Sequence, residues 1–385
     1  MKSIHVCLVS DQTIPNILTI HEHRPAELLF ITTAAMEKKM KVEATLSCLQ
    51  SLGLTWDDGR IHRVTVQEDS LLDSHRKLDE WVTGRESSEF VVNLTGGTKI
   101  MSIAAYEFFK EYGAIMRYIP LHKNEYLSTF PKRLGNAAVP LPLRLGVKHY
   151  LLAYGLTITN EKSVRTAASE AVSRRELTAW IVTEYGNIKP LLERFSEKLR
   201  KQRDNRDGFD WSTSYQPGNS QEKELLDRLG FIHNGIEFRR HLSKSEIIYL
   251  TGGWLEEYCY NAIHGLKGCG IDDVVTGVKI MNALKRDNEF DVMFTRDNAL
   301  FTVECKSLDQ NDDPGAGALY KIAALQKEFG LRVRSFFVST SPHILRNGLL
   351  KPAIAARAEQ FSTIVIKPDD VVNFASRLKE ELKIT

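Results

Sequence analysis

The sequence is poor in cysteine and lacks the spacings that mark a cysteine-based site. Its five cysteines are an odd number and include no Cys-x-x-Cys pair. An odd count without paired spacing excludes a disulfide framework and a zinc ribbon as organising features. We therefore expect reduced thiols, most of them buried.

Long apolar runs are missing as well. The N-terminal segment MKSIHVCLVSD holds only a short apolar run, too short for a signal peptide. No stretch approaches the ~18 consecutive apolar residues of a membrane span. These absences predict a protein without membrane association and favour a cytoplasmic location.

The chain also has no excess of one charge, since 51 basic and 49 acidic residues leave a formal charge of +2. No global positive field attracts nucleic acid, so any such binding must be local. Hydrophobic residues make up 43% and charged residues 26%, an ordinary globular composition. A length of 385 residues predicts two domains, with room for a smaller connecting unit.

Residues 1–140 show short apolar runs that alternate with amphipathic stretches. This βαβ rhythm is typical of a parallel, doubly wound sheet, so we expect a Rossmann-like α/β domain. The predicted strands are residues 5–10, 26–33, 62–67, 89–94 and 114–121, and the predicted helices are 34–52, 70–82 and 99–112.

Pro140 and Pro142 break this pattern and open a connector over residues 141–248. It reads as helical from 163 to 203, and a short helix with a β-hairpin then indicates a small winged-helix-like unit. From residue 249 to 385 the alternation predicts a compact α/β/α domain with a β-hairpin at its centre. The overall fold class is therefore α/β.

Acidic and basic side chains gather in EFDVMFTRDNALFTVECKS, residues 289–307. Asp291 lies on one predicted strand, Glu304 and Lys306 lie on the next, and a turn signal at residues 296–298 joins the strands. Because side chains alternate along a strand, Glu304 and Lys306 point to the same face. A suitable register places Asp291 beside them.

Two carboxylates and an ammonium group suit metal-assisted hydrolysis of phosphodiesters. Asp291 and Glu304 offer hard oxygen ligands for Mn²⁺ or Mg²⁺, and we expect the backbone carbonyl of Cys305, not its thiol, as a further ligand. Lys306 is suited to orient or deprotonate the attacking water and to offset negative charge in the transition state. The alternative is a solvated hairpin face with a cross-strand ion pair. The apolar neighbours of both motifs favour the metal site, because unpaired carboxylates on central strands are costly.

The order Asp-x(12)-Glu-x-Lys resembles the PD-(D/E)xK nuclease superfamily, in which the aspartate and the ExK triplet carry the metal site. The departure is Phe290, where the superfamily motif has proline. The resemblance implies a restriction-endonuclease-like domain with a glutamate on the preceding helix, and Glu256 in GGWLEEY stands at the matching place. It also implies a catalytic polar residue on the helix after the ExK strand, with Lys321 as the first candidate and Gln326 as the next.

A glycine-rich loop, Thr-Gly-Gly-Thr at residues 95–98, follows an apolar strand of the N-terminal domain and precedes a predicted helix. Parallel α/β sheets bind ligands at this carboxyl edge. Glycines let the backbone approach a phosphate, helix-start N–H groups point at it, and Thr95, Thr98 and Lys99 add donors and charge. An anionic nucleotide is the expected ligand.

Two common phosphate motifs are excluded. A Walker P-loop needs glycine directly before Lys99, where Thr98 stands, and the dinucleotide pattern GxGxxG is absent. The plain alternative is a tight strand-to-helix turn with a threonine cap. The array Asn93-x-Thr95-x-x-x-Lys99 contains more polar groups than such a turn requires.

The loop resembles the signature of the CARF domain family, the cyclic-oligoadenylate sensors of type III CRISPR systems, which reads close to NxTGGTKxM. The matching residues are Asn93, Thr95, Gly96, Gly97, Thr98, Lys99 and Met101. That family also uses the loop after the first strand, which implies a second ligand wall formed by Ser10, Asp11, Gln12, Thr13 and Asn16. For this second segment the alternative is a turn in which Pro15 opens a helix.

A CARF domain followed by a PD-(D/E)xK domain resembles the CRISPR ancillary nucleases that cyclic tetra-adenylate activates. The resemblance covers nearly the full chain. It implies a homodimer with the ring-shaped activator on the two-fold axis between CARF domains. It further implies cleavage of single-stranded DNA and RNA with Mn²⁺ or Mg²⁺.

Two other functions stay open at this point. One is a ligand-responsive transcription regulator that binds DNA through the unit near residues 225–242 and has an inert C-terminal domain. The intact set of Asp291, Glu304 and Lys306 argues against it. The other is a constitutive restriction or repair nuclease whose N-terminal domain binds a mononucleotide.

Overall fold

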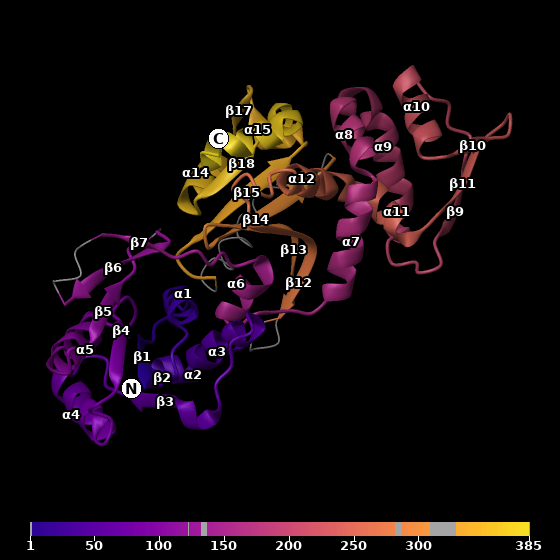
Figure 1. Ribbon diagram of the computed structural model, residues 1–385. Helices are drawn as coiled ribbons and strands as arrows, with labels where there is room; N and C mark the ends of the chain where they lie inside the picture. Colours follow the sequence, from indigo (N-terminus) through magenta and orange to yellow (C-terminus); the bar gives the residue numbers. More distant parts are fainter. Residues whose placement is uncertain (1, 122, 132–136, 282–286, 309–328, 385) are drawn as a thin grey trace.

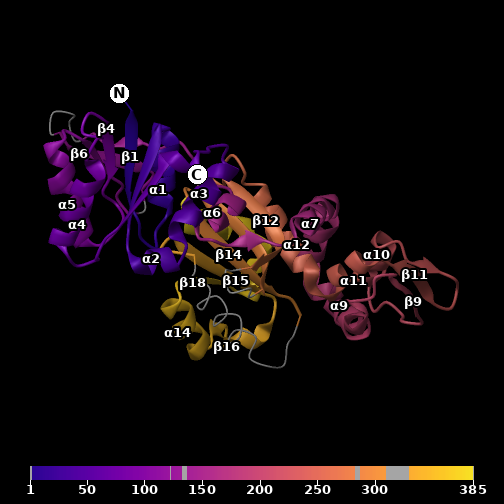
Figure 2. The same ribbon diagram turned by 90° about the horizontal axis from the view of Figure 1, so that it is seen from below.

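The computed structural model describes residues 2–121, 123–131, 137–281, 287–308 and 329–384. Its three parts are the N-terminal domain, the connector and the C-terminal domain. Figures 1 and 2 show the N-terminal domain at one end, the connector at the other and the C-terminal domain between them. The connector from residue 161 on therefore projects away from the N-terminal domain, whereas its first helix, residues 147–153, lies against that domain.

The N-terminal domain is built on one sheet in the order β3-β2-β1-β4-β5-β6-β7. The first five of these strands in the sheet are parallel, and β6 and β7 add antiparallel pairs. The strands are β1 (Ser3–Leu8), β2 (Glu27–Thr32), β3 (Ile61–Thr65), β4 (Glu89–Asn93), β5 (Ile115–Tyr118), β6 (Glu125–Phe130) and β7 (Val139–Pro140). This arrangement confirms the predicted Rossmann-like sheet.

Both faces of this sheet are buried. Val6 and Leu8 point into a core with α4 (Leu71–Val82) and α5 (Lys99–Glu111). Cys7 and Phe30 point into a second core with α1 (Ile14–His23) and α3 (Lys41–Ser51). Successive strand residues therefore face opposite layers, which explains the nearly continuous apolar strands in the sequence.

The helix boundaries match the sequence signals with one exception. Ser70 caps α4 and Thr98 caps α5, each by accepting a backbone hydrogen bond. The single helix predicted over residues 34–52 is wrong, because the chain forms α2 (Ala34–Lys38) and then α3. Met40 between them has a left-handed φ of 54°, which ends the first helix and starts the second.

The connector begins with helices, as predicted, and the short helix and β-hairpin predicted after them are also present, followed by one further helix. Its small sheet has the order β10-β11-β9 and packs with α9 and α10. The elements are α6 (Val147–Ala153), β8 (Thr157–Ile158), α7 (Glu161–Ser173), α8 (Arg175–Thr183), α9 (Tyr185–Leu199), η3 (Arg200–Gln202), β9 (Phe209–Thr213), α10 (Ser220–Arg228), β10 (Ile232–His233), β11 (Phe238–Leu242) and α11 (Lys244–Ile248).

The C-terminal domain has a mixed sheet in the order β18-β15-β14-β13-β12-β8, with the hairpin β13–β14 at its centre as predicted. The strands β12, β13 and β14 are antiparallel, whereas β15 and β18 run parallel to β14. The elements are η4 (Tyr249–Gly253), α12 (Trp254–His264), β12 (Asp273–Met281), β13 (Asp287–Arg296), β14 (Ala299–Lys306), β15 (Val333–Ser339), η5 (Pro342–Ile344), β16 (Leu345–Arg346), β17 (Leu349–Leu350), α14 (Pro352–Gln360), β18 (Thr363–Ile366), η6 (Pro368–Asn373) and α15 (Phe374–Leu382).

The N-terminal and C-terminal domains share one apolar core. Ile17 and Leu49 of the first domain belong to the same cluster as Tyr150 of α6 and as Met293 and Phe329 of the last domain. Helix α6 lies in this junction and packs against α3. Separately, no helix within the described ranges is long and apolar enough to cross a membrane.

Candidate functional sites

The loop after β4 is held by buried amides at the carboxyl edge of the sheet. Asn93 is fully buried, and its side-chain oxygen Oδ1 accepts hydrogen bonds from the backbone amide of Thr95 at 3.2 Å and from the hydroxyl of Thr95 at 2.7 Å. Its Nδ2 donates to Oδ1 of Asn16 at 2.8 Å, and Asn16 donates to the carbonyl of Leu8 at 2.9 Å. These bonds fix the loops after β1 and β4 relative to each other.

Glycine is required at both central positions of this loop. A Cβ on Gly96 would lie 2.1 Å from the backbone oxygen of Leu8, so the loop can approach β1 only without a side chain. Gly97 has a φ of +72°, in the region that favours glycine. The backbone therefore lies open at the start of α5, where its N–H groups are suited to an anion.

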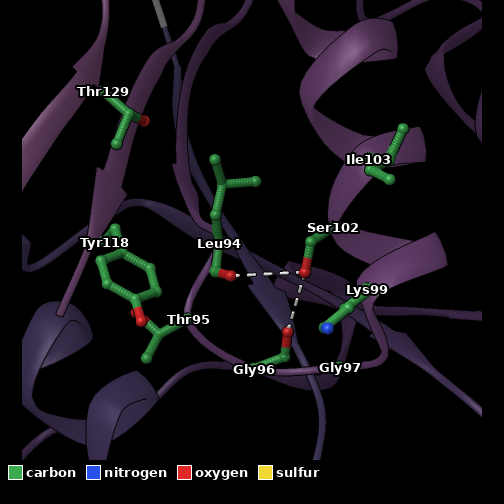
Figure 3. Close-up of a pocket in the computed structure, with 9 residues that line it drawn as sticks. All are labelled: Leu94, Thr95, Gly96, Gly97, Lys99, Ser102, Ile103, Tyr118 and Thr129. Carbon is green, nitrogen blue, oxygen red and sulfur yellow. Dashed lines mark hydrogen bonds between the residues drawn. The ribbon is translucent and has the colours of Figure 1, made fainter. Parts of the chain in front are cut away.

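Two cavities meet at this loop. The first, of about 460 Å³, is shown in Figure 3, where Lys99, Ser102 and Ile103 come from α5 and Tyr118 from the end of β5. The second, of about 470 Å³, extends from the loop after β1 to the C-terminal domain. It is lined by Ser10, Asp11, Gln12, Ile14, Pro15, Leu18, Thr95, Gly97, Tyr118, Ile119, Pro120, Leu121, Lys123, Tyr154, Leu331 and Arg332.

The residues predicted for the ligand fall into two groups. Cavity walls contain Ser10, Asp11, Gln12, Thr95, Gly96, Gly97 and Lys99. The others do not line these two cavities but hold the surrounding loops and helices in place: Thr13, Asn16, Asn93, Thr98 and Met101. In the second group, Met101 is buried in the core, and the hydroxyl of Thr13 donates to the carbonyl of Ala153. Pro15 lies in the first turn of α1, so the turn and helix that were the alternative for this segment are present. Ser10, Asp11 and Gln12 line the second cavity all the same.

Sequence reasoning missed several cavity residues. Tyr118 lines both cavities because it ends the strand next to β4, and the rule that ligands bind at the carboxyl edge of parallel strands points to this position. Tyr154, Leu331 and Arg332 reach the second cavity through tertiary packing alone. No local motif marks them.

The acidic hairpin residues lie together as predicted. The register pairs Val292 with Val303. The next residues along the two antiparallel strands, Asp291 and Glu304, therefore lie opposite each other. Oδ2 of Asp291 accepts a hydrogen bond from the backbone amide of Cys305 at 2.7 Å. Nζ of Lys306 lies 2.8 Å from Oε1 of Glu304, whose side chain is buried. The turn residues 297–298 both have positive φ, which is typical of a two-residue hairpin turn.

Helix α12 places Glu256 beside this pair. Desolvation and the neighbouring Asp291 carboxylate raise the pKa of Glu256 to about 8, although Arg203 of the connector and Lys306 act in the opposite direction. Burial alone would lower the pKa of Lys306, but the Glu304 carboxylate reverses this and holds its pKa above the usual value. The carboxylates thus crowd negative charge into a desolvated site, which fits a cation.

Among the described residues, no three or more His, Cys, Asp or Glu side chains are grouped for a metal. Asp291 and Glu304 with a backbone carbonyl suit Mg²⁺ or Mn²⁺, which take few protein ligands. Burial raises the pKa of the Cys305 thiol well above its usual value, so this side chain is a poor ligand. Lys321 and Gln326 lie outside the described residues.

The two halves of the chain match two families of domains. Residues 4–150 match the Card1 CARF domain, and residues 243–384 match the Card1-like endonuclease domain. The chain thus combines a Card1 CARF domain with a Card1-like endonuclease domain. The Rossmann-like unit is its CARF domain, and the sheet with Asp291 and Glu304 is its endonuclease domain. No curated protein matches the chain.

Solved structures share this architecture. Can2 from Sulfobacillus thermosulfidooxidans, in complex with cyclic tetra-adenylate, is 22% identical, with a TM-score of 0.77 over 98% of each chain. Protein VC1899 from Vibrio cholerae is 19% identical, with a TM-score of 0.78 over 99% of this chain and 98% of that one. A type III CRISPR defence DNA nuclease activated by cyclic oligoadenylate is 18% identical, with a TM-score of 0.52. The match to it covers 88% of this chain and 45% of that one.

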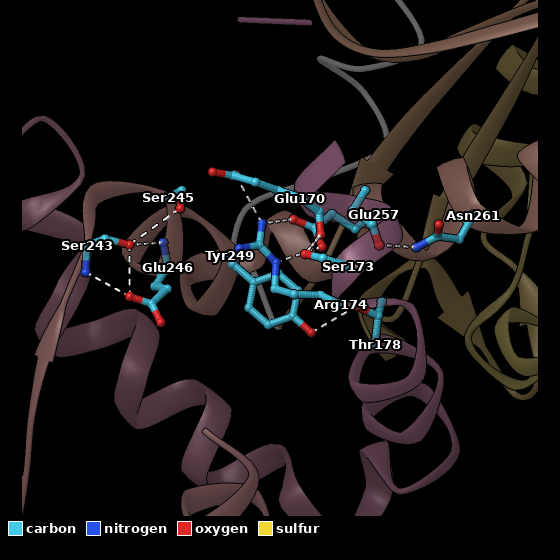
Figure 4. Close-up of polar contacts among 11 residues, drawn as sticks. Glu170, Ser173, Arg174, Thr178, Ser243, Ser245, Glu246, Tyr249, Glu257 and Asn261 are labelled. Atoms are coloured by element: carbon cyan, nitrogen blue, oxygen red, sulfur yellow. Dashed lines mark hydrogen bonds and ion pairs between the residues drawn. The ribbon is translucent and has the colours of Figure 1, made fainter. Parts of the chain in front are cut away.

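An arginine of the connector holds the helix that carries Glu256. Figure 4 shows Arg174, between α7 and α8, reaching Glu257 of α12. The guanidinium donates to this carboxylate through both Nε, at 3.1 Å, and Nη2. The side chain of Arg174 is 18% exposed and that of Glu257 is 13% exposed. The guanidinium also lies 4.8 Å from the centre of the Tyr249 ring. The connector thereby fixes α12 against the endonuclease sheet.

We predict that Arg174→Ala lowers the free energy of unfolding by about 3–5 kcal/mol, because it leaves the Glu257 carboxylate desolvated and unpaired. Denaturant unfolding of the full chain measures this. The double variant Arg174→Met/Glu257→Leu should recover most of the loss, since it removes both charges. Arg175→Ala, at an exposed neighbouring position, is the control and should change stability by less than about 0.5 kcal/mol. Equal losses at both arginines would contradict the role of the ion pair.

Proposed function

We propose that this endonuclease is switched on by a cyclic oligoadenylate, specifically cyclic tetra-adenylate, and that it cleaves single-stranded DNA or RNA with Mn²⁺ or Mg²⁺. The observation that carries the proposal is the second cavity, whose wall contains both CARF loop residues and endonuclease residues. A ligand in this cavity contacts both domains. The Can2 complex with cyclic tetra-adenylate supports the choice of ring.

In the activator site, the open backbone of residues 96–97 and the amides at the start of α5 are suited to bind a phosphate. Lys99 adds a positive charge at the cavity wall. The hydroxyl of Thr95 already accepts from the backbone amide of Ile119 at 2.8 Å, so it orients the loop as well as lining the site. Specificity for a ring follows if two CARF domains face each other across a two-fold axis.

In the nuclease site, Asp291 and Glu304 would hold the metal, which polarises the phosphoryl oxygen when bound. Lys306 lies beside Glu304 and is suited to orient the attacking water and to offset negative charge that develops on the phosphate. Glu256 lies beside Asp291 and Lys306 and adds a third carboxylate to this position. The chain itself thus supplies carboxylate oxygens and a cation.

All five cysteines are free thiols, which is typical of a reducing compartment. We therefore propose that the enzyme acts in the cytoplasm. Such a location also gives it access to an intracellular nucleotide signal and to nucleic acid.

The proposed function is tested by cleavage of labelled single-stranded DNA, single-stranded RNA and plasmid, with and without cyclic tetra-adenylate, in Mn²⁺ and in Mg²⁺. We expect cleavage of a single-stranded substrate only when both activator and metal are present. Equal rates without activator would instead support a constitutive nuclease. DNA binding that responds to the ligand, without cleavage under any condition, would support a transcription regulator.

A second prediction concerns the assembly. If the activator binds on the two-fold axis of a homodimer, one ring should bind per two chains. Calorimetry with cyclic tetra-adenylate measures this ratio, and sedimentation of the same sample gives the mass of the complex. One ring per chain would indicate independent pockets and contradict the shared site.

A further inference from the structure

A glutamine of the activator cavity directly contacts the endonuclease domain. Gln12 lies in the loop after β1, and its side-chain oxygen Oε1 accepts two hydrogen bonds. One comes from the hydroxyl of Tyr154 at 3.2 Å, and the other comes from the backbone amide of Leu331 at 3.1 Å. All three residues line the same cavity. A CARF side chain thus bonds the backbone of the endonuclease domain at the place where the ligand is expected.

The segment that Gln12 contacts has little freedom to move independently. The carbonyl of Phe329 accepts a hydrogen bond from Tyr150 at 3.0 Å, and Tyr150 stacks on Tyr154 with ring centres 5.2 Å apart. Gly330 has a φ of +87°, and a Cβ there would lie 2.2 Å from the Tyr154 hydroxyl. Residues 329–331 therefore pack against α6 and the adjoining Tyr154, and Leu331 is bonded to the CARF loop that carries Gln12.

This segment leads straight into the catalytic strands. The carbonyl of Arg332 accepts from the backbone amide of Leu300 at 3.0 Å, and β15 then pairs with β14 as far as Lys306 and Ser339. The catalytic Glu304 and Lys306 lie on β14. A continuous backbone ladder thus joins the segment at Leu331 to the strand that carries these residues.

A second contact between the domains fixes the turn of the hairpin, close to Leu300. Asn298 of the turn is fully buried, and its oxygen accepts from the backbone amide of Leu145 at 2.8 Å. Its Nδ2 donates to Oδ1 of Asn124 at 3.0 Å. The bond of Gln12 differs from these, because only Gln12 comes from the predicted ligand wall.

We propose that Gln12 is the coupling residue through which the activator controls the nuclease. This proposal rests on the proposed function and names its regulation. When the ring contacts the loop after β1, the loop moves, and the bond from Gln12 to Leu331 moves the start of β15 with it. Coupling requires that the activator bind one arrangement of this contact more tightly than the other.

The test separates activator binding from the activated rate. In the full-length wild type and in Gln12→Leu, calorimetry gives the affinity for cyclic tetra-adenylate, and cleavage of a labelled single strand gives the rate at saturating activator. Leucine fills similar space but accepts no hydrogen bond. We expect the rate at saturating activator to fall at least about 5-fold, which is what one net hydrogen bond is worth, beyond any change in affinity, because saturation removes the effect of weaker binding.

Three further variants make the result specific. Gln12→Glu keeps an acceptor and should retain the saturated rate, although its added charge should weaken binding of an anionic ring. Tyr154→Phe removes one of the two bonds to Gln12 and should give an intermediate rate. Gln50→Leu makes the same substitution at an exposed position of α3 and should leave both quantities unchanged.

Two results would overturn the coupling role alone. If Gln12→Leu loses affinity but reaches the wild-type rate at saturation, Gln12 is a ligand contact. If affinity and rate both stay at wild-type values, the contact with Leu331 transmits nothing. Activator binding by each variant reports that it is folded. A wild-type chain whose rate ignores cyclic tetra-adenylate would instead overturn the proposed function, and the coupling proposal with it.

Discussion

Replacing Glu304 by alanine should reduce the activated cleavage rate at least ~10³-fold, equivalent to about 4 kcal/mol of transition-state stabilisation. The substitution removes one of the two carboxylates proposed to hold the metal, and the metal stabilises charge on the phosphoryl group. It also leaves Lys306 without its 2.8 Å partner. Activator binding should be unchanged, because Glu304 lines neither of the two cavities at the glycine-rich loop. Single-turnover cleavage and calorimetry on the same preparation measure both quantities.

A matched control lies on the same hairpin. Glu289 is an exposed carboxylate of β13, and Glu289→Ala should retain the rate within about 2-fold. Asp291→Ala should behave like Glu304→Ala. Lys306→Ala should lose most of the rate but still bind metal, because the lysine acts on water and phosphate. Turnover by Glu304→Ala at the wild-type level would remove the hairpin from the active site.

Replacing Lys99 by alanine should weaken binding of cyclic tetra-adenylate by about 10- to 100-fold. A charged hydrogen bond to a phosphate is worth about 1.5–3 kcal/mol, and Lys99 is the helix-start cation at the wall of the first cavity. The nuclease residues are untouched, so the activated rate should return at high activator concentration. Calorimetry and an activator titration of cleavage test the two halves of this expectation.

The control for Lys99 is Lys110, an exposed lysine near the opposite end of α5. Lys110→Ala removes the same charge from the same helix and should leave affinity unchanged within about 2-fold. If both variants lose affinity equally, the effect arises from net charge and not from the loop. If neither does, the glycine loop is only a strand-to-helix turn.

The parts of the fold that local chemistry determines were predictable from the sequence. The turn at residues 297–298 needs positive φ at both positions, and its Asp-Asn pair tolerates that geometry, so the hairpin and the approach of Asp291 to Glu304 followed. Similarly, Thr98 marked the start of α5 because a threonine side chain can cap a helix.

The contacts between domains were not predictable, because they join residues far apart in the chain without any motif. Gln12 was expected to face a ligand, but its bond to Leu331 spans more than three hundred residues. Arg174 read as one charge among many in a helical connector, and only packing shows that it holds Glu257. The break at Met40 was missed because an isolated left-handed residue needs no glycine.

The central claim is that the CARF site and the nuclease site form one switch, and reciprocal binding tests it most directly. Linkage requires that each ligand change the affinity of the other by the same factor. The measurement is the affinity for cyclic tetra-adenylate with and without a non-cleavable single-stranded oligonucleotide, in Ca²⁺ to prevent turnover. We predict tighter activator binding in the presence of the oligonucleotide, by ~5–150-fold for a coupling of about 1–3 kcal/mol. Identical affinities would contradict the claim, because the two sites would then share a chain without any switch between them.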